Sequence, residues 1–210
     1  EKHGGVYDAI SFHPDIMFHH IANERVVYAP GTSPHVVKRL EFYGFKLIEG
    51  GTVLKPYYPY DIAYNVARVG KFAFHNLKYT DHVLKRELEN TGVELVHVNQ
   101  GYTKCSISVI DQDSIITSDK GIAKAAEKRG LDVLLIKPEE GILLPGVGHG
   151  FIGGSSGMID KDKWMIAGDF KSLESCDVIK KFLEKKGISC IYVHNQPVMD
   201  IGSIIPLLTR

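Results

Sequence analysis

Asn99-Gln-Gly-Tyr-Thr-Lys-Cys-Ser106 is a polar, glycine-containing segment between two apolar runs that we expect to be strands. Cys105 marks this segment, and four similar short segments, centred on Asp15, Asp61, Gly153 and Asp200, have matching places along the chain. The separations between successive members are 46, 44, 48 and 47 residues. A fixed period of this size is typical of repeat architectures, so the repeat is the basis of the fold prediction.

Each repeat has one expected order of elements: the polar segment, an apolar run, a turn, a second run, a capped helix and a third run. In the first unit, strands over 16–21, 26–29 and 45–48 accompany a helix that begins at Ser33 and ends at Gly44. In the next two units Thr80 and Asp119 are the expected N-caps. The expected helix ends of the remaining units are glycines: Gly92, Gly130 and Gly187.

About three strands for each helix, with short turns between the first two strands, favour hairpins. A doubly wound α/β sheet alternates one strand with one helix and is kept as the alternative. We predict an α/β (α+β) fold, a five-fold pseudosymmetric propeller of ββαβ units in a single domain. The expected units are 13–58, 59–99, 100–146, 147–196 and an incomplete fifth at 197–210, completed by residues 1–12. In this prediction a strand within 201–208 pairs with 6–12 and closes the ring.

Bulk composition limits the class of partner. The 210 residues contain 25 basic and 25 acidic side chains without a basic stripe, which argues against a nucleic-acid interface. No apolar run approaches the ~18 residues of a membrane span, so no membrane partner is expected. Three cysteines without a disulfide pattern predict free thiols in a reducing compartment, the cytoplasm. The chain begins at Glu1 rather than Met, so residues upstream of it and the oligomeric state stay open.

A five-fold ring of ββαβ units resembles the guanidine-modifying enzyme superfamily, also called the penteins. That superfamily includes arginine deiminase, agmatine deiminase and dimethylarginine dimethylaminohydrolase, and a non-catalytic translation initiation factor shares the architecture. The segments Gln-Gly-Tyr-Thr-Lys-Cys and Gly-Phe-Ile-Gly-Gly resemble a bacterial branch distinct from these three enzymes. The resemblance implies a central channel that the polar segments face and a small-molecule ligand inside it.

The chain departs from the deiminases where their functional groups are expected. Their Glu-Gly-Gly-Asp corresponds to 100–103, which reads Gln-Gly-Tyr-Thr and lacks both acids. Their His-x-Asp corresponds to 149–151, where His149 is kept and the acid is replaced by Phe151. Their nucleophilic cysteine falls near Gly202 and Ser203. Because a guanidinium needs anionic partners, the standard arginine-type hydrolysis is not expected.

Cys105 and His149 are the candidate catalytic residues. Cys105 follows Lys104, whose ammonium is expected to lower the thiol pKa, and His149 lies between glycines that leave its imidazole accessible as a base. The alternatives are a small buried Cys105 in the core and a His149 hydrogen-bonded within its loop. The sequence does not decide whether the two side chains come within reach of each other.

The candidate substrate-binding residues belong to the polar segments: Asp15, Asp61, Gln100, Thr103, Asp200 and Ser203. In a ring, Asp15, Asp61 and Asp200 would converge on one mouth of the channel, where they suit a cationic ligand. The alternative for the three acids is turn chemistry, since Asp accepts backbone hydrogen bonds at bends. We expect no cofactor, and His13, His19 and His20 lack the spacing of a metal site.

Two functions therefore remain open. The first is a cysteine- and histidine-dependent hydrolase or transferase that acts on a small amidino, guanidino or amide-like molecule. The second is a non-catalytic binding protein that keeps the propeller fold but has lost the catalytic residues of the superfamily.

Overall fold

The computed structural model describes residues 1–207, which form four separate three-stranded sheets. In each sheet the first two strands are antiparallel and the second and third are parallel. The strands, sheet by sheet, are β1 (Phe18–Ala22), β2 (Arg25–Tyr28), β3 (Lys46–Glu49); β4 (Ala67–Val69), β5 (Phe72–His75), β6 (Glu94–His97); β7 (Ile107–Val109), β8 (Ser114–Thr117), β9 (Asp132–Leu135); β10 (Ser156–Asp160), β11 (Lys163–Ile166), β12 (Ser189–Tyr192). The mixed α/β class is confirmed, and the single doubly wound sheet is excluded for this part of the chain.

One helix connects the two parallel strands of each sheet. These helices are α2 (Pro34–Phe42), α3 (His82–Glu89), α5 (Lys120–Glu127) and α6 (Cys176–Lys185). Ser33 and Asp119 cap α2 and α5 as predicted. The prediction of Thr80 as N-cap of α3 is wrong by one residue: the side chain of Asp81 accepts from the backbone N of Leu84 at 2.9 Å.

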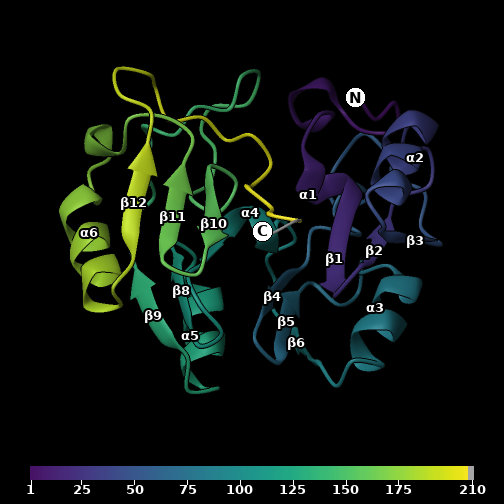
Figure 1. Cartoon of the computed structure of the whole chain (residues 1–210), viewed down its shortest axis with the longest axis horizontal. Coiled ribbons are helices and arrows are strands. Elements are labelled where there is room, and N and C mark those ends of the chain that lie inside the picture. The colour runs from purple at the N-terminus through teal and green to yellow at the C-terminus, as the bar shows by residue number, and fades with distance from the viewer. Residues whose placement is uncertain (208–210) are drawn as a thin grey trace.

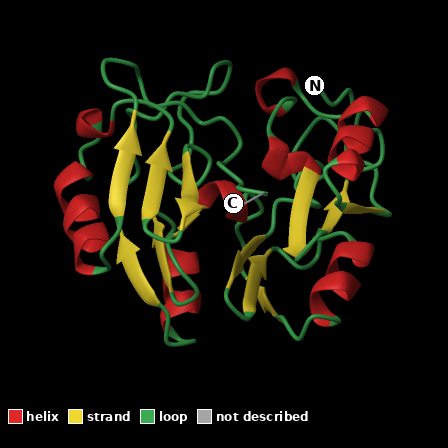
Figure 2. Ribbon diagram, in the orientation of Figure 1, coloured by secondary structure: helices red, strands yellow, loops and turns green. Residues whose placement is uncertain are grey.

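The helices lie on the outside of the molecule and the first strands of the sheets lie nearer its centre (Figure 1, Figure 2). Two short helical turns, α1 (Pro14–Met17) and α4 (Thr103–Ser106), occupy the polar segments that precede β1 and β7. Each leads directly into the first strand of its sheet. The turn α4 lies near the middle of the fold (Figure 1).

The predicted closing strands of a fifth unit do not form. Residues 201–207 are not a strand, residue 208 lies outside the described part, and the N-terminal stretch contains a 3-10 helix, η1 (Asp8–Ile10). Gly202 and Ser203 have φ of 77° and 70°, and Pro206 has no N–H to donate, so this stretch does not extend as a ladder strand. A closed five-fold ring is therefore not seen.

Backbone hydrogen bonds connect residues 201–204 to the first and fourth units instead. The backbone N of Ser203 donates to the O of Gly154 at 2.7 Å, and that of Ile204 donates to the O of Ser156 at 3.2 Å. The backbone N of Asp15 donates to the O of Gly202 at 3.3 Å. The first and fourth sheets are thus bridged by an irregular segment, which brings Ser203 beside Asp15.

The core is built between the helices and their sheets. Trp164 on β11 is fully buried, and its indole N–H donates to the Ser108 hydroxyl on β7 at 2.8 Å. The Ser156 hydroxyl on β10 also donates to the Ser108 hydroxyl, at 2.8 Å. This small polar cluster joins the third and fourth sheets.

Candidate functional site

Asn65, which precedes β4, holds the turn that carries Cys105. Its Oδ1 accepts from the backbone N of Lys104 at 2.9 Å and of Cys105 at 3.3 Å. Its Nδ2 donates to the Sγ of Cys105 at 3.1 Å and to the backbone O of Asp15 at 3.2 Å. A fully buried amide thus fixes α4 against α1.

The Cys105 thiol donates to a carboxylate. Its Sγ lies 3.1 Å from Oδ2 of Asp15, and the Ser203 hydroxyl donates to the same oxygen at 2.6 Å. Cys105, Asp15 and Ser203 are all at least 95 % buried. The other oxygen, Oδ1 of Asp15, has no hydrogen-bond partner within residues 1–207. An unpaired buried carboxylate oxygen is costly, so this atom is a candidate ligand acceptor.

Asp200 forms the second acidic group of the site. Its two oxygens accept from the backbone N of Phe151 at 2.9 Å and of Gly202 at 3.1 Å. The Nδ1 of His13 lies 3.7 Å from Asp200 Oδ1. A Cβ at Gly154 would lie 2.2 Å from this carboxylate, so glycine is needed there. Burial, followed by the charge of Asp15, raises the pKa of Asp200.

Burial of the thiol, followed by the charges of Asp15 and Asp200, raises the pKa of Cys105 well above its usual value. The sequence-based argument that Lys104 lowers it is therefore wrong for the free protein. Burial also lowers the pKa of the Lys104 ammonium, and Lys104 makes no ion pair within 4 Å in the described chain. The resting state of Cys105 is a protonated thiol.

Cys105 and His149 line the same cavity, whose volume is about 270 Å³. His13 and Asp200 also line it, and Tyr7, Tyr102 and Phe151 give it aromatic walls. The rings of Tyr102 and Phe151 are 6.4 Å apart at an angle of 33°. No hydrogen bond joins Cys105 to His149 in the described residues, and His149 is exposed. The cavity thus combines a thiol, a carboxylate and two imidazoles with apolar walls.

The other sequence-predicted residues lie around this centre rather than in it. The hydroxyl of Tyr102 donates to Oδ2 of the fully buried Asp61 at 2.7 Å, and burial raises the pKa of Asp61. Gln100 donates to Asp119 at 3.3 Å and accepts from the Tyr102 backbone N at 3.0 Å. The Thr103 hydroxyl is fully buried and lies within 2.8 Å of two backbone carbonyl oxygens. Thr103 therefore has a structural role.

Sequence reasoning missed Asn65, Tyr7 and the contact of His13 with Asp200. His13 precedes the Pro14–Asp15 pair, so its place in a repeated polar segment was a usable signal. No sequence signal marked Asn65 or Tyr7, because their roles depend on long-range contacts such as the one between Asn65 and Cys105.

Metal and membrane features were searched in residues 1–207. No group of three or more His, Cys, Asp or Glu side chains in that range is placed to hold a metal ion. Burial lowers the pKa of His19 to about 3, so this side chain is neutral. None of the helices in the same range has the length and apolar character to cross a membrane.

The fold is similar to that of three solved enzyme structures. One is dimethylarginine dimethylaminohydrolase from Pseudomonas aeruginosa, a cysteine-to-serine mutant complexed with citrulline. The similarity covers 89% of this chain and 69% of that enzyme's chain, at 10% identity and a TM-score of 0.56. For inosamine-phosphate amidinotransferase from Streptomyces griseus, the similarity covers 92% of this chain and 65% of that chain, at 10% identity and a TM-score of 0.57. For agmatine deiminase from C. jejuni, the similarity covers 87% of this chain and 70% of that chain, at 13% identity and a TM-score of 0.52.

The chain belongs to a family of unknown function, DUF6873, whose model matches residues 1–205. A search of curated protein sequences finds no significant match. The chain spans about two thirds of the length of the similar structures, and at these identities the similarity is one of fold.

Proposed function

We propose that the cavity binds a small molecule with an amidinium or guanidinium group and that Cys105 attacks the carbon of that group. The observation that carries this proposal is the hydrogen bond from the Cys105 thiol, which lines the cavity, to the buried Asp15, whose second oxygen has no hydrogen-bond partner among the described residues. The similar structures include enzymes that act on such groups, which supports the same class of substrate.

The charges of the site favour a cation. Asp15 and Asp200 both raise the pKa of Cys105, so the surroundings of the thiol are negatively charged. A planar cation with several N–H donors satisfies a free carboxylate oxygen, and such charge-assisted hydrogen bonds are the strong ones. The bound cation also favours the thiolate, because an opposite charge stabilises the charged form of a neighbouring group. The substrate itself then activates the nucleophile.

The proposed reaction transfers the Cys105 proton to Oδ2 of Asp15 as the sulfur–carbon bond forms. The carbon–nitrogen bond then breaks, and the departing amine takes a proton from His149 acting as general acid. Hydrolysis releases the thiol and yields a urea from a guanidinium or an amide from an amidinium; attack by a second amine gives the transferase variant. Asp15 thus acts as the base at the thiol, and His149 acts at the leaving group.

The walls of the cavity favour a ligand without a carboxylate. Neither Lys nor Arg is among the residues that line it within the described chain, whereas aromatic side chains are prominent. A free amino acid would have to bury its carboxylate unpaired, which is costly. We therefore expect an amidine or guanidine on an apolar or aromatic body to bind better than arginine.

A non-catalytic binding protein is the second candidate. The observation that favours it is the burial of Cys105 with its thiol donating to Asp15, because burial and the charge of Asp15 raise the thiol pKa and disfavour the nucleophilic thiolate. In this case the same cation binds between Asp15 and Asp200 and leaves unchanged.

Ammonia release and ligand binding separate the two candidates. The purified chain would be incubated with benzamidine, agmatine and arginine, with Cys105→Ser as the inactive variant and Cys190→Ser as the matched control. Turnover that Cys105→Ser abolishes and Cys190→Ser retains supports the enzyme. Binding that requires Asp200 without turnover supports the binding protein, and failure of all three compounds to bind would refute the proposed substrate class.

Free thiols suit a reducing compartment, so a cytoplasmic location remains part of the proposal. We also propose that the four units and the two terminal segments form one domain, because the site draws on both ends of the chain through Asp15 and Ser203.

A further inference from the structure

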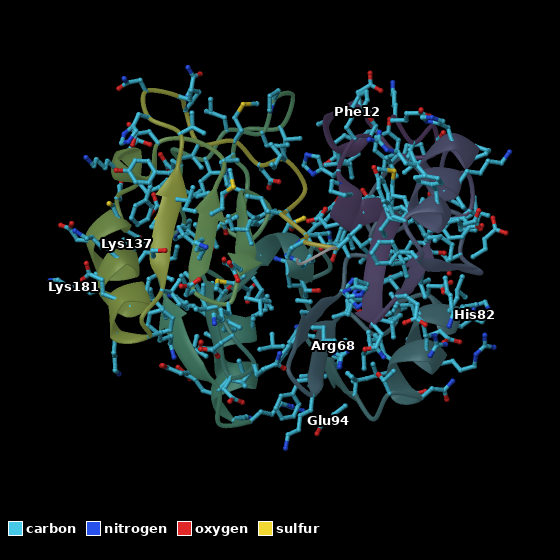
Figure 3. All side chains as sticks on the ribbon, viewed as in Figure 1. Phe12, Arg68, His82, Glu94, Lys137 and Lys181 are labelled. Atoms are coloured by element: carbon cyan, nitrogen blue, oxygen red, sulfur yellow. The ribbon has the colours of Figure 1, made fainter. Side chains whose placement is uncertain are left out.

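A second cavity, of about 670 Å³, shares no lining residue with the first. It lies beside β1, β4 and β10 and is closed on one side by the terminal segment 204–206. Arg68, which lines it, is labelled in the lower middle of Figure 3. Its volume is in the range of small-molecule sites.

Two cations in this cavity lack an acidic partner. Lys104 and Arg68 line the wall, and neither makes an ion pair within 4 Å in residues 1–207. The Nε of Arg68 donates to the O of Gly70 at 3.2 Å, and its Nη1 donates to the O of Ile21. A guanidinium has five N–H donors, so three remain for a ligand. Burial lowers the pKa of both side chains, although the charges of Asp15 and Asp200 act to raise that of Lys104.

The acidic groups at the cavity rim are already occupied. Asp160 lies 3.0 Å from the ammonium of Lys163, and Asp111 lies 3.6 Å from that of Lys186, which also pairs with Asp132 at 2.8 Å. Lys161, by contrast, lines the rim and makes no ion pair within 4 Å in the described chain. His20 also lines the cavity, and its Nε2 is 2.6 Å from the O of Asn23. The uncompensated charge in the cavity is therefore positive.

The rest of the wall is apolar. Val109 and Met158 come from β7 and β10, and Ile204, Ile205 and Pro206 come from the terminal segment. Gly157 allows that segment to lie against β10, since a Cβ there would be 2.1 Å from the O of Ile204. Charged donors on one wall and branched apolar side chains on the other suit a ligand with an anionic head and an apolar body.

We propose that this cavity is a separate binding site for a small organic anion, a carboxylate or phosphate on an apolar body. Arg68 and Lys104 hold the anionic head, and the terminal segment covers the apolar body. Arginine is suited to bidentate pairing with both head groups, and lysine adds a point charge. Lys104 precedes Cys105 directly, so the two sites are connected through one dipeptide.

The test uses octanoate, octyl phosphate, inorganic phosphate and octylammonium as probes, with binding measured by calorimetry. We expect octanoate or octyl phosphate to bind, octylammonium not to bind, and the tighter of the two anions to identify the head group. Arg68→Met should weaken this binding at least about tenfold and Lys161→Gln about twofold to fivefold. Lys38→Gln, in which the altered residue is exposed and does not line the cavity, should bind as the wild type does.

Methyl NMR of the wild-type chain keeps the proposal testable if Arg68→Met fails to fold, because Arg68 also holds two backbone carbonyls. Octanoate should shift the resonances of Met158, Ile204 and Ile205 and leave those of Leu144 and Val147 at the first cavity unchanged. Shifts at the first cavity alone, binding of octylammonium as tight as that of octanoate, or absence of binding by every anion would overturn the proposal.

Discussion

Asp15→Asn tests the electrostatic account of Cys105 directly. The change keeps the size of the side chain and an oxygen that accepts from the thiol, but it removes a negative charge 3.1 Å from the sulfur. Repulsion between two unit charges at this distance is about 1.3 kcal/mol in water-like surroundings and about 5 kcal/mol at an effective dielectric constant of about 20. The pKa of Cys105 therefore falls, and the smaller value already raises the thiolate fraction about tenfold.

The assay is the rate of iodoacetamide alkylation at Cys105 between pH 6 and 9, read by peptide mass spectrometry. Asp15→Asn should react at least about tenfold faster than the wild type at pH 7, while its turnover falls because Asp15 no longer accepts the thiol proton. Cys176 and Cys190 provide internal controls whose rates should not change. An unchanged rate at Cys105 would refute the argument that Asp15 holds the thiol protonated.

Two further predictions concern stability. Burial raises the pKa of Asp61, so the folded chain loses stability as the pH rises above about 3.9, the ordinary pKa of an aspartate. The Asp61→Asn side chain still accepts the hydrogen bond from Tyr102. Denaturant unfolding should therefore show this variant more stable than the wild type at pH 7 and equally stable at pH 3. A variant less stable at both pH values would contradict this. Gly154→Ala places a Cβ 2.2 Å from Asp200 and should cost about 1–3 kcal/mol in urea unfolding. Gly121→Ala in α5 is the control, and equal midpoints for the two variants would show that the close contact at Gly154 carries no cost.

Local signals in the sequence were sufficient for most of the fold. Short turns between apolar runs correctly indicated the antiparallel pairs, and Gly44, Gly92, Gly130 and Gly187 all follow a helix with positive φ. These features depend on a few neighbouring residues, so a single chain reveals them. The choice of Thr80 over Asp81 failed because both residues are N-cap formers and only the geometry distinguishes them.

The terminal segment shows where local reasoning fails. Residues 201–208 are rich in Ile and Leu, which predicts a strand, but Gly202 and Ser203 turn the chain toward His13 and Asp15. A Cβ at Gly202 would lie 2.4 Å from the Cβ of His13, so the turn depends on a contact between opposite ends of the sequence. No local pattern contains that information.

The candidate site was predictable as a set of segments and not as a set of contacts. The repeated polar segments identified Asp15, Cys105, Asp200 and Ser203, which do gather near one cavity. The reversed effect on the thiol pKa was not predictable, because Lys104 is adjacent in sequence while Asp15 is adjacent in space. Asn65 was missed for the same reason.

The central claim is that the cavity recognises an amidinium and delivers it to Cys105. The most direct measurement compares two small electrophiles of similar size, 2-chloroacetamidine, which is cationic, and 2-chloroacetamide, which is neutral. Peptide mass spectrometry should show the cation alkylating Cys105 at least about tenfold faster than the neutral compound, with the preference lost in Asp200→Asn. Equal rates at Cys105, or a cation that reacts only with Cys176 and Cys190, would contradict the account.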